Sequence, residues 1–353
     1  MSVLFAILLF SLLIFLHELG HFVTAKLSGV QVNEFSMFMG PALYKKQLGE
    51  TLYSIRCIPI GGYCAMEGED EDTENPRSFQ KAAWWKRLII LAAGSVMNFI
   101  TGLLLLAIVA APAQQFIVPV VSQIEQGCAL AGEHGIQVGD RILELDGEKI
   151  YAQSDFSMIL ALNGGDVHDL VLERGGERIV LDDFTMEKRE FPNEDGTVSL
   201  RYGFSFSVEE ATFGAKLRFI WNNALDTVRM VRLSLKMLLN GQAGLSDMTG
   251  PVGIVQVMSD TAAQSDTVLD AFMNLISFGS FIAINLAVMN LLPIPALDGG
   301  RIVCLLLTTV VEAVTKKKID PKYEGYLHAA GMVLLLGLMA VIMFKDIFVL
   351  FKG

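Results

Sequence analysis

Long apolar runs alternate along the chain with stretches of mixed character. A helix needs about 20 predominantly apolar residues to cross a bilayer. Four stretches meet this requirement, namely Val3–Leu27, Leu88–Ala111, Phe272–Leu292 and Tyr326–Leu350. The pattern therefore predicts a polytopic α-helical membrane protein with four transmembrane helices. Val3–Leu27 lacks a basic leader and a small-residue cleavage site, so we interpret it as a retained helix rather than a signal peptide.

The third apolar stretch is too long to be one helix. Sequence from Phe272 to Thr315 is nearly all apolar, and a single helix of that length would measure about 65 Å, twice the hydrocarbon thickness. A break is predicted between Asn290 and Gly300, which enclose two prolines, one aspartate and paired glycines. Irregular backbone at membrane depth is tolerated only where protein or a hydrated cavity satisfies it. We therefore expect this break to face a site.

The segment between the first two spans contains a predicted β region, residues 30–66. Val32–Met39 and Thr51–Ile58 have strand character, and Pro59–Tyr63 carries a turn signal. The Thr51–Ile58 edge could pair with an extended peptide, or the region could be an ordinary hairpin without a ligand. The acidic run Glu67–Glu74 is interpreted as a solvated loop.

The segment between the second and third spans contains a predicted α+β domain, residues 115–206. Its expected strands are Ile117–Ile124, Arg141–Leu145, Val167–Glu173 and Arg178–Asp182, with a helix over Tyr151–Leu162. The Gly135–Ile150 stretch resembles the signature of bacterial PDZ domains. Residues 212–240 then form an amphipathic helix, which either lies at the outer membrane surface or packs on this domain.

Composition narrows the possible functions. Mean hydropathy is +0.48 and 52% of residues are hydrophobic, which is typical of several membrane passes plus a soluble domain. The formal net charge of −11 arises within residues 112–267, and nothing in it indicates nucleic-acid binding. The four cysteines are scattered, so no disulfide framework is expected. Cys57 and Cys64 could be thiol ligands, but their spacing matches no common zinc site.

The candidate metal-binding and catalytic residues of the first span lie at His17-Glu18-Leu19-Gly20-His21. His17 and His21 are four residues apart, so on a helix they share a face and can bind one metal ion together. Glu18 lies beside them, placed to handle the proton of a metal-bound water. Ionisable residues within lipid are costly and tend to mark function. The alternative is a pair of buried histidines satisfied by backbone carbonyls.

Depth in the membrane links this motif to the break after the third span. At 1.5 Å per residue, His17 and His21 lie about 20–27 Å from the start of their span, and Asn290 lies about 27 Å from the start of its own. Asp298 can therefore meet the two histidines, or it could instead be a helix cap beside Gly299-Gly300. Two histidines, one carboxylate and an open fourth position make a catalytic zinc arrangement for one ion. Asn98 in the second span needs a partner, either a neighbouring helix or substrate backbone.

Basic residues predict the orientation of the spans. They gather in the first and third connections, at Lys26, Lys45, Lys46, Arg56, Arg77, Lys81, Lys86, Arg87, Arg301, Lys316, Lys317, Lys318 and Lys322. Both connections are therefore expected to face the cytoplasm. Both termini and the 115–206 domain would then be extracytoplasmic, with the active site towards the cytoplasmic side.

Together these motifs resemble the site-2 protease family of intramembrane zinc metalloproteases, in its bacterial regulator-of-sigma-E form with a single PDZ domain. The resemblance rests on His17–His21, Pro59–Tyr63, Gly250–Ile254 and Asn290–Gly299, and spans nearly the whole chain. It implies that His17, His21 and Asp298 are zinc ligands, that Glu18 is the catalytic acid/base, and that Asn290 positions substrate or the oxyanion. Asn98, Gly61, Gly62 and Tyr63 are further candidate substrate-binding residues.

The resemblance implies proteolysis of transmembrane segments of membrane proteins, such as trimmed anti-sigma factors and remnant signal peptides, in the bacterial inner membrane. Two other functions share parts of the same pattern. A membrane zinc transporter would need polar groups along the whole path, yet the outer halves of the spans are apolar. A non-catalytic PDZ scaffold would not need the complete set of ligands and base. The outer domain would bind a peptide or exclude bulky substrates.

Overall fold

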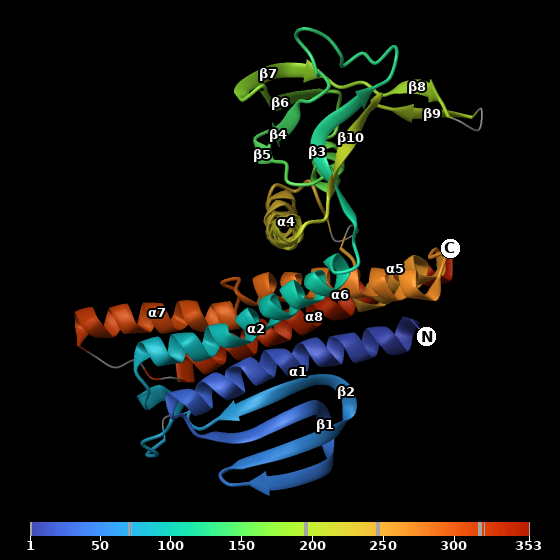
Figure 1. Ribbon diagram of the computed structural model, residues 1–353. Coiled ribbons are helices and arrows are strands. Elements are labelled where there is room, and N and C mark those ends of the chain that lie inside the picture. Colours follow the sequence, from blue (N-terminus) through green and yellow to red (C-terminus); the bar gives the residue numbers. More distant parts are fainter. Residues whose placement is uncertain are drawn as a thin grey trace. The chain divides into compact units, whose positions relative to one another are not determined.

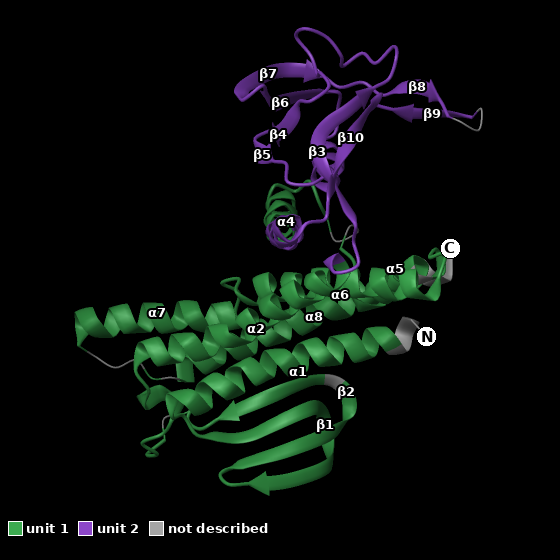
Figure 2. Ribbon diagram, viewed as in Figure 1, with its two compact units in different colours: residues 1–109, 227–353 green, residues 110–226 purple. Residues whose placement is uncertain are grey.

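The computed structural model describes residues 2–69, 71, 73–193, 197–244, 248–316, 320 and 322–352. Two compact units make up the chain, one from residues 1–109 with 227–353 and the other from residues 110–226 (Figure 2). Parts of two predicted features, namely Asp70 and Asp72 of the acidic run and Lys317 and Lys318 of the third connection, lie outside the described residues.

Within the described residues, four helices are long and apolar enough to cross a membrane. They belong to α1 (Ser2–Ser28), α2 (Trp84–Ala110), α6 (Val268–Asn290) and α8 (Lys322–Lys352), which run side by side in Figure 1. The four predicted spans are confirmed, with ends that differ by a few residues. Large apolar side chains such as Leu104 and Leu334 remain more than 60% exposed on these helices, as expected of positions that face lipid rather than protein.

The third apolar stretch breaks where its prolines and glycines predicted. α6 ends at Asn290, and α7 (Asp298–Thr315) begins at Asp298. The loop between them folds back onto the first turn of α7, so tightly that a Cβ on Gly299 or Gly300 would collide with the backbone of residues 291–294. The paired glycines therefore allow the loop to bring the Asp298 side chain back towards α1.

A short helix, α5 (Pro251–Ala263), precedes α6 and had no counterpart in the sequence-based prediction. Its buried Met258 packs with Leu9 and Leu13 of α1 in one apolar cluster. At its N-terminus the amides of Gly250 and Gly253 donate to the Asp346 carboxylate of α8, at 2.9 and 3.0 Å. α5 therefore joins the metal-bearing first helix to the last helix.

The sheet beside α1 differs from the predicted hairpin. β1 (Val32–Leu48) and β2 (Thr51–Met66) are both bent, so the 32–37 arm of β1 pairs with residues 62–66 on one side and with 52–55 on the other. Residues 44–48 then cover the far side of 51–55. The predicted free edge at Thr51–Ile58 is therefore wrong for residues 52–55, which have strand neighbours on both sides. Arg56 and Ile58 each pair with one residue of β1 only. Among the described residues, Gly62–Met66 form one open edge of this sheet and residues 44–48 form the other.

The turn predicted at Pro59–Tyr63 corresponds to this bend only in part. Gly61 has a positive φ of 81°, which suits the bend. Gly62 and Tyr63, however, already pair with Met37 and Ser36 as strand residues. Proline and glycine marked a change of direction inside a continuous strand, not its end.

The second unit is built on a six-stranded sheet with the order β10-β3-β4-β6-β7 and β5 paired to β4. Its elements are β3 (Gln115–Ile124), β4 (Arg141–Leu145), β5 (Glu148–Lys149), α3 (Gln153–Asn163), β6 (Val167–Arg174), β7 (Glu177–Thr185), the β8–β9 hairpin (Arg189–Pro192 and Val198–Arg201) and β10 (Phe204–Glu210). α4 (Phe213–Leu239) follows, and its first half belongs to this unit.

The four strands and the helix predicted for this segment occur with ends shifted by at most three residues, whereas β5, β8, β9 and β10 were not predicted. The core lies between the sheet and α3, where Ile142, Leu145, Phe156, Ile159 and Leu170 are at most 3% exposed. α4 ends within one residue of the predicted 212–240 helix on each side.

Candidate metal centre

α1 carries His17, Glu18 and His21, and a close crossing with α2 brings the second helix against them. A Cβ on Gly20 would lie 2.8 Å from the Ala93 carbonyl carbon. On the opposite side, a Cβ on Gly94 would lie 2.6 and 2.8 Å from ring atoms of His17 and collide with His21 Nε2. Two glycines at the crossing therefore let the α2 backbone pack directly on the imidazoles, which larger residues would displace.

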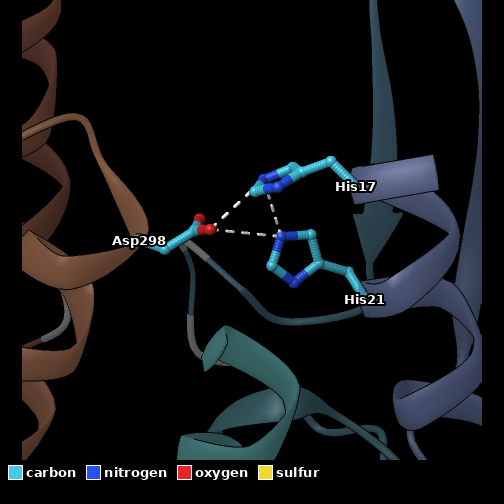
Figure 3. A group of neighbouring side chains, drawn as sticks. All are labelled: His17, His21 and Asp298. Atoms are coloured by element: carbon cyan, nitrogen blue, oxygen red, sulfur yellow. Dashed lines mark hydrogen bonds and ion pairs between the residues drawn. The ribbon is translucent and has the colours of Figure 1, made fainter. Parts of the chain in front are cut away.

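Asp298 reaches the two histidines from the start of α7 (Figure 3). Its Oδ2 atom lies 3.2 Å from His17 Nε2 and 3.5 Å from His21 Nε2, and the two Nε2 atoms are 3.2 Å apart. All three side chains are at least half-buried, and Oδ2 has no hydrogen-bond partner among the described residues. Three electron-pair donors thus converge on one point, although residues 17 and 298 are far apart in sequence.

These separations fit one tetrahedral metal ion. With donor–metal bonds of about 2.0–2.1 Å, neighbouring ligands of a tetrahedral zinc lie about 3.3 Å apart. The observed separations of 3.2, 3.2 and 3.5 Å bracket that value. Without a cation, the buried donors would face one another with their lone pairs unsatisfied. The residues present therefore fit a zinc ion with three protein ligands and one open position.

Each histidine has a second contact that orients its ring. His21 Nδ1 donates to the Ile90 carbonyl at 2.7 Å, which leaves Nε2 with its lone pair directed at the centre. The Asn98 amide lies 3.4 Å from His17 Nδ1, and Asn98 is 1% exposed. Its Oδ1 has no partner among the described residues. Rotating the amide by 180° lets Oδ1 accept the Nδ1 proton of His17.

The position of Asn98 favours the first of its two predicted partners, a neighbouring helix. Its side chain is buried against His17 rather than lining the cavity at the centre. Asn290 is half-buried at the last residue of α6 and likewise does not line this cavity. Of the predicted substrate-binding residues, Tyr63 lines it. Gly62 lies beside the catalytic candidate, since a Cβ there would be 3.5 Å from Glu18 Cγ.

The cavity next to the three donors has a volume of about 670 Å³. Glu18 lines it together with the Tyr63–Met66 segment, part of one open edge of the sheet. Glu67, Glu69 and Glu71 also line it, so the acidic run reaches the site rather than forming only a solvated loop. Glu69 forms an ion pair with Arg301, one turn after Asp298. A peptide that entered here would meet the sheet edge, Glu18 and the metal ligands together.

Cys64 lines the same cavity. Burial, followed by the nearby Glu18 and Glu69 carboxylates, holds its pKa well above the ordinary thiol range. A neutral thiol is a poor zinc ligand, because the thiolate is the binding form.

A second group of donors, namely Cys304, Glu324 and His328, lies between α7 and α8. The Ala296 amide donates to His328 Nδ1 at 2.9 Å, so in the neutral ring the proton sits on Nε2. That nitrogen faces Glu324 Oε1 at 3.8 Å and has no lone pair to offer a metal. His328 instead holds the loop before Asp298, where Ala296 has a positive φ of 80°.

Sequence reasoning missed the residues that position the ligands. The small residues Ala93-Gly94-Ser95 indicated close helix packing, but not that Gly94 would meet the ligands. The Ile90 carbonyl and His328 belong to no motif. A signal existed for one of them. His328 is a lone histidine in an apolar span, and an ionisable residue there indicates a structural or functional partner.

Comparison with known proteins agrees with this geometry. The sequence profile of peptidase family M50 matches residues 5–338. The chain belongs to peptidase family M50, the site-2 proteases. A Clostridium perfringens protein with "zinc metalloprotease" in its name is 36% identical over 98% of each chain. A similarly named Fusobacterium nucleatum protein is 33% identical over 100% of each. Regulator of sigma-W protease RasP of Bacillus subtilis is 26% identical over 97% of each.

This membership identifies the chain as a zinc metalloprotease with membrane-spanning helices, as the sequence motifs predicted. M50 peptidases act on membrane proteins, so the bacterial membrane is where this chain is expected to work.

Proposed function

We propose that His17, His21 and Asp298 hold a single zinc ion and that Glu18 is the general acid/base of an intramembrane endopeptidase. The observation that carries this proposal is the spacing of the three donor atoms, 3.2–3.5 Å apart and beside Glu18 in one cavity. When bound, zinc lowers the pKa of a coordinated water and polarises the scissile carbonyl.

The side chains of this site have the other roles in the mechanism. Glu18 takes the proton of the attacking water and later delivers it to the leaving nitrogen. His21 keeps its tautomer through Ile90, and Asn98 does the same for His17. Asn290, at the end of α6, helps to position the substrate or its developing oxyanion. The Glu69–Arg301 pair fixes the cavity wall one turn from Asp298.

A helical substrate hides its scissile carbonyl in an i→i−4 hydrogen bond, so it has to unwind before attack. We propose that the Gly62–Met66 edge of β2 pairs with the unwound segment. This edge is open among the described residues, and Tyr63–Met66 line the cavity with Glu18. Pairing compensates the backbone groups that unwinding exposes. Gly61 provides the bend that turns this edge towards α1.

The substrates proposed are single-span membrane proteins such as trimmed anti-sigma factors, and remnant signal peptides. The relative named as a regulator of sigma-W protease supports the first class. The distribution of basic residues supports an inner-membrane topology in which both termini and the 110–226 unit are extracytoplasmic. The active site then opens towards the cytoplasm, which supplies the water. The 110–226 unit, PDZ-like in sequence, gates or binds the outer part of the substrate.

Purified protein in detergent, with a single-span membrane substrate, tests the proposal. Glu18→Gln should retain one zinc per chain and lose cleavage by at least about 100-fold, since one positioned acid/base contributes about 10²–10⁴-fold. His17→Ala and Asp298→Ala should lose the zinc itself. Glu74→Gln, at an exposed residue that does not line this cavity, is the matched control and should keep both. If Glu18→Gln cleaves as fast as the parent, the proposed mechanism is wrong.

A further inference from the structure

The 110–226 unit contains a second cavity, separate from the metal centre. Its volume is about 580 Å³, within the range of ligand-binding pockets. Its walls are the first half of β3, the N-terminal end of α3 and the first half of α4. No part of the proposed proteolytic mechanism uses it.

One wall of this cavity is an open strand edge. β3 pairs with β10 along Gln115–Val118, and on its other side pairs with β4 only at Val120↔Arg141. Along residues 115–119, no strand in the described part of the chain pairs with this side of β3. Residues 115–119 line the cavity without interruption.

The hydrogen-bond register shows which backbone groups face the cavity. The Ala211 amide donates to the Gln114 carbonyl at 2.8 Å, so this facing pair bonds across the β3–β10 ladder. Bonding pairs alternate along antiparallel strands, and the register is unbroken from Gln115 to Val118. Phe116 and Val118 therefore bond to β10. Gln115 and Ile117 direct their N–H and C=O groups to the open side.

The side chains around this edge give it a charge preference. Phe116 stacks on Phe219 of α4 at 4.4 Å, which fixes the helix beside the strand. Arg218 and Glu209 form an ion pair at 3.0 Å and neutralise each other. Arg141 is the remaining charged residue of the lining. The cavity thus favours an acidic side chain.

We propose that this groove binds an extended polypeptide segment by strand addition to Gln115–Val118, with an acidic side chain of the bound segment against Arg141. Two outward residues on β3 provide up to four backbone hydrogen bonds, and alternate side chains of the peptide enter the cavity. The bound segment is the part of the substrate that lies outside the lipid. That assignment rests on the proposed proteolytic function, whereas the binding itself does not.

Binding to the full-length protein in detergent tests this proposal. The probe is a fluorescent eight-residue peptide of alternating valine and threonine with one central glutamate, capped at both ends and followed by anisotropy. Ile117→Pro removes one outward N–H without touching the β10 ladder, and should weaken binding about fivefold or more. Ile117→Ala, which keeps the N–H, is the matched control and should bind like the parent.

Two further comparisons identify the binding mode. A peptide methylated on alternate backbone nitrogens should bind at least about fivefold more weakly than the parent peptide, because strand addition uses those amides. Arg141→Gln should abolish the preference for glutamate over glutamine in the probe. Equal binding by Ile117→Pro and Ile117→Ala would overturn the proposal and assign any residual binding to another edge, such as Gly62–Met66. Protection of the 115–118 amides from hydrogen exchange in detergent without peptide would also overturn it.

The outcome is separate from that of the proteolysis test. Peptide binding is measured without turnover, so it can succeed with the Glu18→Gln protein. If binding fails while the parent protein still cleaves, the groove is wrong and the proposed protease stands. If cleavage fails while binding persists, the reverse holds.

Discussion

At the scale of single residues, Gly94 controls how closely α2 approaches the metal ligands. A methyl group there would overlap His21 and press on His17, so Gly94→Ala should displace the rings and lower zinc affinity about 10–100-fold, the range found for residues that orient ligands. Zinc content after dialysis against a chelator measures this. Gly337→Ala in α8, where a Cβ meets no atom within 4 Å, is the control. Equal zinc content in both variants would contradict this role.

Asn98 tests whether the orientation of His17 matters. Asn98→Ala removes the amide beside His17 Nδ1 and should raise the rate of zinc loss to a chelator about 10–100-fold. Asn98→Asp keeps an acceptor and should restore most of the affinity. Thr101→Ala is the control, because the Thr101 hydroxyl donates to Met97 of its own helix. The assay needs no turnover. If Asn98 contributed only to substrate binding, Asn98→Ala would lose zinc at the parent rate, and its proposed role in orienting His17 would be wrong.

These residues show how far the sequence predicts such a site. Spacing along a helix placed His17, Glu18 and His21 together, and depth in the membrane brought Asp298 to them. The groups that hold the rings could not be predicted in this way. A backbone carbonyl at Ile90 and a missing side chain at Gly94 act only through the crossing of α1 with α2, which no local pattern specifies.

At the scale of elements, Asp346 caps α5 from another helix. Its carboxylate accepts from the amides of Gly250 and Gly253, and the side chain is nearly buried. Asp346→Ala leaves those amides without an acceptor and should lower the free energy of unfolding by about 1–3 kcal/mol. Asp346→Asn retains one oxygen and should lose less. Thermal unfolding in detergent measures both, and equal midpoints for parent and alanine variant would exclude the capping role.

The β1–β2 hairpin turn is tied to α1 by a pH-dependent contact. Glu50 accepts hydrogen bonds from Arg77 and Lys26, which lower its pKa from 4.5 to about 2. A carboxyl whose pKa is lowered in the folded protein stabilises the fold at pH values above its ordinary pKa. This contribution is lost as the pH falls towards 2.

Because the Glu50 contact stabilises the fold only where the carboxyl is ionised, its removal should have a pH-dependent effect. At pH 7, Glu50→Gln should lower the free energy of unfolding by about 1 kcal/mol or less, because the pair is partly exposed. The difference from the parent should shrink between pH 4.5 and pH 2. Unfolding midpoints across that range measure it, with exposed Glu74→Gln as the control. A difference that is independent of pH would refute the contact.

Element-scale prediction succeeded where periodicity is local and failed where strands bend. Four apolar spans and the amphipathic α4 follow directly from composition over one helix length. The double pairing of the 32–37 arm does not, since it depends on bends inside β1 and β2, where Gly40 and Gly61 have positive φ. An open edge consequently lies at Gly62–Met66 rather than along the whole of Thr51–Ile58.

At the scale of the whole molecule, residues 115–210, the larger part of the 110–226 unit, can be removed where the two ends of the segment meet. Gln115 and Glu210 pair at the start of β3 and the end of β10, and the flanking Gln114 and Ala211 are hydrogen-bonded at 2.8 Å. Two glycines can therefore replace residues 115–210 without stretching the chain. The other unit has its own apolar clusters around α1 and should fold without this insertion.

The protein that lacks residues 115–210 separates the chemical step from substrate selection. It should keep its zinc and cleave a bare transmembrane peptide at the parent rate, because every ligand and Glu18 lie in the remaining unit. On a substrate with an extended outer segment, KM should rise about fivefold with kcat unchanged, since β3 is gone. If the unit also excludes bulk, a substrate with a folded outer domain should be cleaved only by the protein that lacks residues 115–210. Loss of cleavage of the bare peptide, with zinc still bound, would show that the active site needs the removed unit and would contradict this division of labour.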